Sequence, residues 1–235
     1  MRPSNGWLML LACLIALPAS AATPSQVQAE YRLELEGLEV AEIKEAYTRT
    51  DDRYHIESVS RAVGIAAMLK PETILGHSEG TVTARGLHPL KVTQQRSKDV
   101  ERNASAVFDW QTHQLVLTDR LGTRQLALPD DTQDRFSAMY QFMFLDLPGA
   151  GTLTFHMTNG SKLDIYDYQV TPEQSVDVPG GQFKALYVAT PPQANGARTE
   201  LWLAVEHHLI PVKVVVTEGD GNRYTQSLTR LTITP

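Results

Sequence analysis

The sequence predicts an all-β protein: a curled antiparallel sheet or half-open β-barrel with one main helix and one short helix packed against it. Apolar and polar residues alternate along much of the chain, as in YRLELEGL from Tyr31 to Leu38, which is typical of strands with one buried face. Asn-Gly and Asp-Gly pairs follow such runs at 159–160, 195–196 and 220–221, and these pairs favour tight hairpins. A sheet built from hairpins has to curl or close to protect its edges.

The N-terminus has the pattern of a secretory signal peptide over residues 1–21. Arg2 precedes an apolar run from Trp7 to Leu17, and small residues follow at 19 and 21. The run is shorter than the roughly 20 residues that a membrane-spanning helix needs. We therefore expect export to the periplasm, cleavage near Ala21, and a mature chain without a membrane span.

Cys13 permits a second interpretation of this segment. Leu10 to Cys13 resembles a bacterial lipobox, in which the lipidated cysteine would tether the protein to a membrane. A lipoprotein anchored at Cys13 is therefore the alternative to a freely exported protein. Cys13 is also the only cysteine, so a chain cleaved near Ala21 would contain neither a disulfide nor a catalytic thiol.

Composition predicts a single domain over residues 22–235 and excludes several classes of partner. The formal net charge is −6, and such an acidic chain is not suited to neutralising the phosphates of nucleic acid. The segment PGGQF at 179–183 lies between two strand-like runs and is not followed by a helix, so it does not predict a phosphate-binding loop. We expect no cofactor.

Two segments depart from the strand pattern. A compact apolar group at Val63–Pro71 predicts a short helix that ends at the proline. The main helix is expected after Asp134, a suitable N-cap, and before Pro148. Its apolar residues recur at helical spacing: Phe136, Met139, Tyr140, Met143 and Phe144. They predict either a plug for the core or, because methionine adapts to irregular shapes, one wall of an apolar ligand pocket.

Two tryptophans are additional candidates for ligand binding. Trp110 and Trp202 lie in strand-like runs, where a tryptophan most often packs in the core. The functional alternative is a stacking platform for a sugar or a lipid headgroup. The seven candidate ligand-binding residues are thus Trp110, Phe136, Met139, Tyr140, Met143, Phe144 and Trp202.

The segment ILGHSEGTV at 74–82 matches G-x-S-x-G, the pattern of a serine-hydrolase nucleophile elbow around Ser78. That elbow requires a helix directly after the serine. Here the sequence continues as TVTARGLHPLKV, which alternates like another strand. We therefore expect a strand whose glycines permit a bulge, and no catalytic residue; a serine hydrolase acting through Ser78 is the least favoured hypothesis.

The histidines and carboxylates predict neither a metal site nor an acid–base pair. His207 and His208 are neighbours, so their side chains would point to opposite faces of a strand. Asp164 and Asp167 are three apart and would also lie on opposite faces. Histidines that are distant in sequence can still converge in the fold, and spacing alone leaves this open.

A resemblance extends over nearly the whole mature chain, from Tyr31 to Ile233. The sequence resembles the bacterial family of unknown function DUF3108, in stretches that include YRLELEGLEVAEIKEAY, YHIESVSRAVGIAAML, SEGTVTARGLHPLKV, VFDWQTHQLVLT, RFSAMYQFMF, VPGGQFKALYV and RTELWLAVEHHLIPVKVVV. The resemblance implies an exported envelope protein and supplies no catalytic residues. The expected architecture is also similar to that of periplasmic lipoprotein carriers, which shelter acyl chains, although fold alone does not determine function.

Two non-enzymatic functions follow. In the first, the protein binds an apolar or amphipathic envelope molecule, a lipid or lipoprotein chain, in its curled sheet. In the second, the barrel is filled and the protein is a scaffold that binds a periplasmic protein partner through sheet edges and loops such as Thr190–Arg198.

Overall fold

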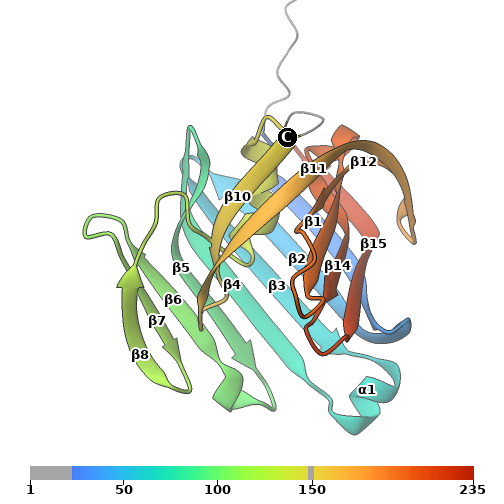
Figure 1. The fold of residues 1–235 in the computed structure, drawn as a ribbon, viewed down its shortest axis with the longest axis horizontal. Helices are drawn as coiled ribbons and strands as arrows, with labels where there is room; N and C mark the ends of the chain where they lie inside the picture. Colours follow the sequence, from blue (N-terminus) through green and yellow to red (C-terminus); the bar gives the residue numbers. More distant parts are fainter. Residues whose placement is uncertain (1–22, 148–150) are drawn as a thin grey trace, which may run out of the picture.

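The computed structural model describes residues 23–147 and 151–235, which form one 15-stranded sheet. The predicted signal peptide and Cys13 lie outside the described residues. The N-terminal half of the sheet contains β1 (Gln26–Leu35), β2 (Leu38–Thr50), β3 (Arg53–Ala62), β4 (Thr73–Thr83), β5 (Gly86–Arg96), β6 (Ala104–Asp109), β7 (Gln114–Asp119) and β8 (Gly122–Ala127). The C-terminal half contains β9 (Gln133–Asp134), β10 (Gly151–Thr158), β11 (Leu163–Val178), β12 (Gly181–Ala189), β13 (Arg198–Ala204), β14 (Ile210–Thr217) and β15 (Arg223–Thr234). The predicted fold class, a curled antiparallel sheet, is confirmed (Figure 1).

The sheet consists of two meanders, which are joined by the pairing of the first strand, β1, with the last strand, β15. β1 runs antiparallel to β15, from Gln26 opposite Thr234 to Leu35 opposite Tyr224. Every other neighbouring pair is a sequential hairpin, except that the short β9 runs parallel to β10. Pairing of β1 with β15 therefore converts two separate meanders into one continuous sheet.

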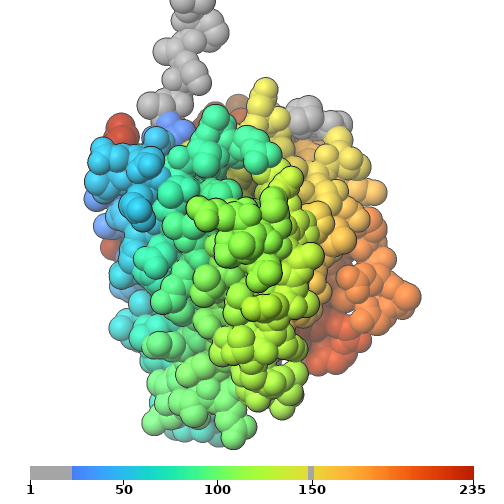
Figure 2. Space-filling view, turned by 90° about the vertical axis from the view of Figure 1, so that its left-hand side faces the viewer, coloured from blue at the N-terminus to red at the C-terminus, as the bar shows by residue number. Residues whose placement is uncertain are grey.

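The two free edges of the sheet, β8 and β9, are successive in the chain and are separated only by residues 128–132. This connection forces the sheet to curl until its edges approach. Arg124 on β8 donates to the carbonyl of Ser161, beyond β10, at 2.8 Å. Figure 2 shows the yellow-green segment around β8 directly beside the yellow segment around β10. Curling of this kind covers edges that would otherwise offer unpaired backbone groups.

Strand alternation separates a buried inner face from a more accessible outer face. On β3, Tyr54, Ile56 and Ser58 are buried, whereas Glu57 between them is exposed and His55 is half-buried. The inner face supplies most of an apolar core in which the largest fully buried side chains include Tyr47, Tyr140 and Phe142. Burial of one such side chain contributes about 1.5–3 kcal/mol, so the core is the main source of stability.

The helices are short and differ in their relation to the sheet. They are α1 (Gly64–Leu69), α2 (Ser137–Gln141) and the 3₁₀ turns η1 (Val100–Arg102), η2 (Phe142–Phe144) and η3 (Val205–His207). α2 and η2 follow each other directly, so the predicted apolar repeat extends over both. α1 contacts β2 and β3 but buries none of its residues. No helix in the described part of the chain is long and apolar enough to cross a bilayer.

Candidate functional site

The segment between β9 and β10 turns into the interior of the curled sheet. α2 contacts β5 from the N-terminal half and β14 from the C-terminal half. Phe136 and Tyr140 pack in a core cluster with residues of the N-terminal strands, whereas Phe142 packs with residues of β10 to β13. The helix therefore joins the two halves of the sheet, and its surroundings are the candidate functional site.

Asp134, the N-cap predicted from the sequence, lies two residues before the N-cap position of α2, which is Phe136. Its Oδ1 accepts hydrogen bonds from the backbone amides of Phe136 at 2.8 Å and Ser137 at 3.0 Å. Its Oδ2 accepts one from the Ser78 hydroxyl on β4 at 2.6 Å. Burial raises the pKa of the Asp134 carboxyl, and these hydrogen bonds oppose the rise. One buried carboxyl thus binds the backbone at the start of the helix and ties it to β4.

Ser78 is part of this structural connection. Its side chain is 0% exposed, and its hydroxyl also lies 3.1 Å from the Tyr54 hydroxyl. β4 continues through the whole G-x-S-x-G segment, and the register shifts beside Gly80, so the predicted strand with a bulge is confirmed. The neighbouring His77 is on the opposite face of β4, where it cannot serve as a base for Ser78.

Two glycines of the motif make room for aromatic side chains. A Cβ atom at Gly76 would overlap the Phe136 ring, and one at Gly80 would overlap the His88 carbonyl and the Tyr54 ring. The spacing Gly76-x-Ser78-x-Gly80 places all three residues on the inner face. The motif therefore serves close packing between β4, the interior helix and the neighbouring strands.

One side of the interior helix is less enclosed than the rest. Arg135 in the turn before α2 is exposed, and Met139 on α2 and Met143 on η2 are half-buried. Met139 packs against both the N-terminal and the C-terminal cores. We call these three residues the Arg-Met strip. The three residues combine one cation with two flexible apolar side chains.

Arg135 is exposed at its surface, but desolvation by its surroundings lowers the pKa of its guanidinium, with Arg96 adding to this effect and the carboxyls of Glu45 and Asp134 opposing it. Its Nη1 donates to Gln94 Oε1 at 2.7 Å, and its guanidinium lies 5.3 Å from the centre of the Phe136 ring. Within residues 23–147 and 151–235, it forms no ion pair shorter than 4.0 Å. Burial raises the pKa of Glu45, on β2, and the charge of Arg135 partly opposes this rise. The strip therefore offers a guanidinium that can pair with an incoming anion.

The structure brings six of the seven predicted ligand-binding residues into one core cluster and places Trp202 in another. Phe136 and Tyr140 are buried, whereas Met139, Met143 and Phe144 are half-buried. Trp110 packs at the margin of the same core, with its indole donating to the Pro89 carbonyl at 2.6 Å. Trp202 packs in a different cluster, against Tyr187 at 4.9 Å between ring centres. A ligand-binding role for these seven residues remains a prediction.

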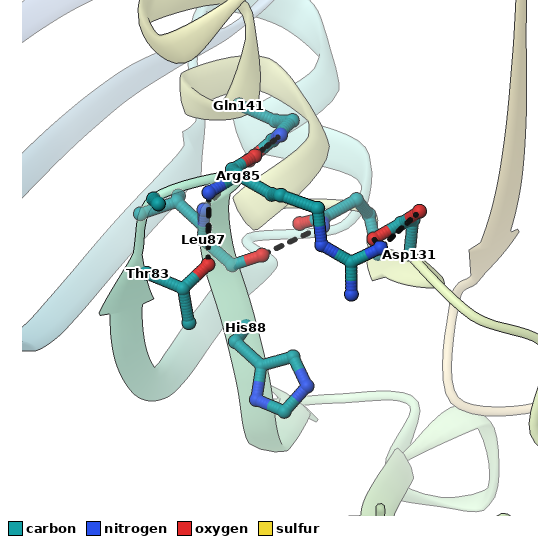
Figure 3. Close-up of a pocket in the computed structure, with 8 residues that line it drawn as sticks. Thr83, Arg85, Leu87, His88, Asp131 and Gln141 are labelled. Atoms are coloured by element: carbon teal, nitrogen blue, oxygen red, sulfur yellow. Dashed lines mark hydrogen bonds and ion pairs between the residues drawn. The ribbon is translucent and has the colours of Figure 1, made fainter.

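A small hollow lies at the β4–β5 turn (Figure 3). It measures about 180 Å³, and its walls include an ion pair between Arg85 and Asp131 at 3.2 Å. Gln141 of α2 accepts from the Leu87 amide at 2.7 Å and donates to the Arg85 carbonyl at 2.8 Å. Gln133 donates to the Leu87 carbonyl at 2.9 Å. The side-chain amides of Gln133 and Gln141 thus hold the β4–β5 turn against the helix. Because the hollow is small and its walls carry charged groups, it is better suited to a small polar molecule than to an acyl chain.

The sequence profile of the family described as "Protein of unknown function (DUF3108)" matches residues 30–229. The chain belongs to the DUF3108 family. The resemblance predicted from the sequence is thereby confirmed. A search of curated proteins found no match.

The DUF3108 chain is also similar in fold to a solved structure described as "Crystal Structure of Beta-barrel-like Protein of Domain of Unknown Function DUF1849 from Brucella abortus". The TM-score is 0.58 at 14% sequence identity, and the match covers 90% of this chain and 99% of the other. At that identity the similarity shows the fold alone. It supports the description of this DUF3108 protein as β-barrel-like.

Sequence reasoning missed the contact between Arg135 and Gln94 in this DUF3108 protein. Arg135 follows the predicted N-cap and has no distinctive motif, and Gln94 lies in an ordinary alternating strand. Nothing in their spacing indicates that β5 and the helix meet. The adjacent pair His207 and His208, by contrast, belongs to no cluster of metal-ligating side chains in the described residues.

Proposed function

We propose that the protein is an exported, non-enzymatic binding protein of the periplasm, and that it binds an amphipathic envelope molecule with an anionic headgroup. The Arg-Met strip is the proposed contact surface. Arg135 pairs with the headgroup, and Met139 and Met143 contact the first part of an acyl chain. The single observation that carries this proposal is that Arg135 is exposed and Met139 and Met143 are only half-buried, although the other residues of α2 are buried.

Several features support the choice of ligand. A guanidinium makes strong, directional hydrogen bonds to phosphate and carboxylate. Methionine side chains suit chains of variable shape because they are flexible and polarisable. Much of the remaining interior is already filled by Phe136, Tyr140 and Phe142. This favours a ligand held along the helix rather than one enclosed in a large cavity.

The proposal that the protein is not an enzyme rests on Ser78. Its hydroxyl is enclosed and donates to Asp134 at 2.6 Å, so it is neither accessible nor paired with a histidine base as a nucleophile needs. A fluorophosphonate probe should therefore not label the protein. Labelling that disappears in Ser78→Ala would contradict this part of the proposal.

The first experiment is an intact-mass measurement on the protein purified from periplasm under native conditions. The expected polypeptide mass corresponds to cleavage near Ala21, and added mass lost on denaturation identifies the cargo. Lipidation at Cys13 would give a different polypeptide mass. Recovery only from the cytoplasm would contradict export.

The second experiment measures binding of a fluorescent phosphatidylglycerol to matched variants. Met143→Asp is expected to abolish binding because it places a carboxylate on the strip. Met68→Asp on the exposed α1 is the control for the same chemical change. Arg135→Gln should weaken binding by about tenfold, the loss of roughly one charge-assisted hydrogen bond, whereas Arg61→Gln on the exposed side of β3 should have no effect.

Folding of these variants has to be verified by circular dichroism and thermal unfolding. A folded Met143→Asp or Arg135→Gln protein that binds the lipid as the wild type does would refute the strip as the contact surface. If Met143→Asp unfolds, Arg135→Gln decides the question, because Arg135 is exposed and glutamine can still donate to Gln94.

α1 favours a second candidate function, docking of a protein partner. Met68 and Leu69 are 85% and 82% exposed, and α1 itself carries no charged residue. Exposed apolar groups of this kind are typical of interaction surfaces. A photocrosslinker at Met68 should then give one defined adduct that is lost in Leu69→Asp. The same probe at Gln193 in the loop 190–198 tests the interface predicted from the sequence.

A further inference from the structure

Three metal-ligating side chains meet on the outer face of the β3–β4 hairpin. They are His55 on β3 and His77 and Glu79 on β4, and we call them the His-Glu cluster. One nitrogen or oxygen atom from each residue lies within 4.8 Å of the corresponding atoms of the other two. No other group of three such side chains meets this condition in the described residues.

Strand register brings these residues together. His55 is directly opposite Glu79, and Glu57 is directly opposite His77. Residues two apart on one strand share a face, so the segments His55-Ile56-Glu57 and His77-Ser78-Glu79 place their histidines and glutamates side by side. The repeated H-x-E pattern is visible in the sequence, but the antiparallel pairing that superimposes the two copies is a property of the fold.

The side chains are close enough for small rotations to complete a metal site. The two imidazole rings are 4.3 Å apart between centres and inclined at 65°. His77 Nε2 lies 3.5 Å from Glu79 Oε2, and His55 Nε2 lies 3.2 Å from Glu57 Oε1. His55 and His77 are half-buried and Glu79 is exposed, so the side chains have room to adjust and an ion can enter from solvent.

We propose that the His-Glu cluster binds a divalent transition-metal ion, with Zn²⁺ as the preferred ion. Two imidazoles and one carboxylate match the ligand types and number of a zinc site that keeps its fourth position open. Ca²⁺ and Mg²⁺ prefer oxygen ligands, so two ring nitrogens select against them. This site goes beyond the proposed lipid-binding function, because it lies on the opposite face of the sheet from the Arg-Met strip.

The surroundings of the cluster are compatible with an open coordination position. A hollow of about 290 Å³ has His55 and Glu79 in its wall, together with Thr48, Thr50 and Arg53. A water molecule or a small anion can occupy the fourth position from this side. Glu57, hydrogen-bonded to His55, is placed to orient that imidazole, as carboxylates commonly do for zinc-ligating histidines.

The test is a Zn²⁺ titration of the protein prepared without a polyhistidine tag, by calorimetry and by competition with a chromophoric chelator. One Zn²⁺ per chain is expected. His55→Gln and His77→Gln should each weaken binding by at least about tenfold, and Glu79→Gln should weaken it less. His156→Gln, on β10 and outside the cluster, is the matched control and should bind like the wild type.

A second measurement keeps the proposal falsifiable if a variant is destabilised. The X-ray absorption spectrum of Zn²⁺ on the wild-type protein should show two imidazole nitrogens among the ligands. Bound Zn²⁺ should also raise the melting temperature of the wild type and of His156→Gln, but not that of His55→Gln. Wild-type binding weaker than about 1 mM, or equal binding by folded His55→Gln and His77→Gln variants, would overturn the proposal.

Discussion

The two short α-helices have similar apolar side chains and opposite environments. α2 and η2 lie inside the curled sheet, where Phe142 is 1% exposed, whereas α1 extends from the β3–β4 connection with Met68 85% exposed (Figure 1). Both segments were recognisable as helical from the sequence. The difference teaches that the burial of a short apolar helix depends on where the topology places it. Both helices connect neighbouring strands, β9 to β10 and β3 to β4. α2 follows an edge strand into the space between the two halves of the sheet and contacts β5 and β14, whereas α1 lies beside β2 and β3 of one half.

The largest expected contrast between the helices is in stability. Phe142→Ala should lower the free energy of unfolding by about 3–5 kcal/mol, because it removes a large side chain from a packed core. Met68→Ala should change it by less than about 0.5 kcal/mol. Urea denaturation of both variants measures the contrast. Equal effects would mean that α1 is covered by a contact absent from the isolated chain.

The next contrast concerns the connection between the interior helix and the sheet. Asp134→Ala removes three hydrogen bonds and leaves two amides and the Ser78 hydroxyl without their acceptor, so it should cost about 1–3 kcal/mol. Asp134→Asn keeps the shape and can still accept from the amides, so it should cost less. Equal losses in the two variants would show that the bonds to the amides contribute little. Neither α1 nor α2 has a side-chain cap at its N-cap position, so the loss measures the connection through Asp134.

The close contact between Gly76 on β4 and the Phe136 ring gives a change in stability of intermediate size. Gly76→Ala introduces a methyl group into the position of the Phe136 ring and should cost about 1–3 kcal/mol. In the background of Phe136→Leu, which provides space, the same substitution should cost clearly less. A double-mutant cycle measures this coupling. Additive effects would contradict direct contact between the two positions.

The smallest expected effect is the pH dependence that arises from Asp134. Burial raises its pKa in the folded state above the ordinary value of 3.8, so the folded state retains this proton to higher pH than the unfolded chain does. The associated stabilisation is complete below about pH 3.8 and is lost as the pH rises through the folded-state pKa. The unfolding free energy of the wild type minus that of Asp134→Asn should therefore fall as the pH rises from about 4. A flat or rising difference would contradict the raised pKa.

Much of the fold could be predicted because it depends on local pattern. Alternation and turn residues indicated the hairpins, and Asp134 with its apolar repeat indicated the interior helix. The strand predicted through Ser78 is also confirmed, since β4 continues to Thr83. By contrast, neither the proximity of Arg135 and Gln94 nor that of His55 and His77 was predicted, because each depends on which strands and helices are neighbours.

By itself the sequence determined the class of the fold, the inner and outer faces of its strands, and the segments that form helices. These properties follow from the periods of 2 and 3.6 residues that place side chains on one face. Only the tertiary structure decided that β1 pairs with β15, that α2 is enclosed while α1 is exposed, and which polar side chains meet. Those outcomes depend on contacts between residues far apart in the chain, such as Ser78 with Asp134. Such contacts form when the whole sheet curls to bury its apolar face, and no local pattern encodes them.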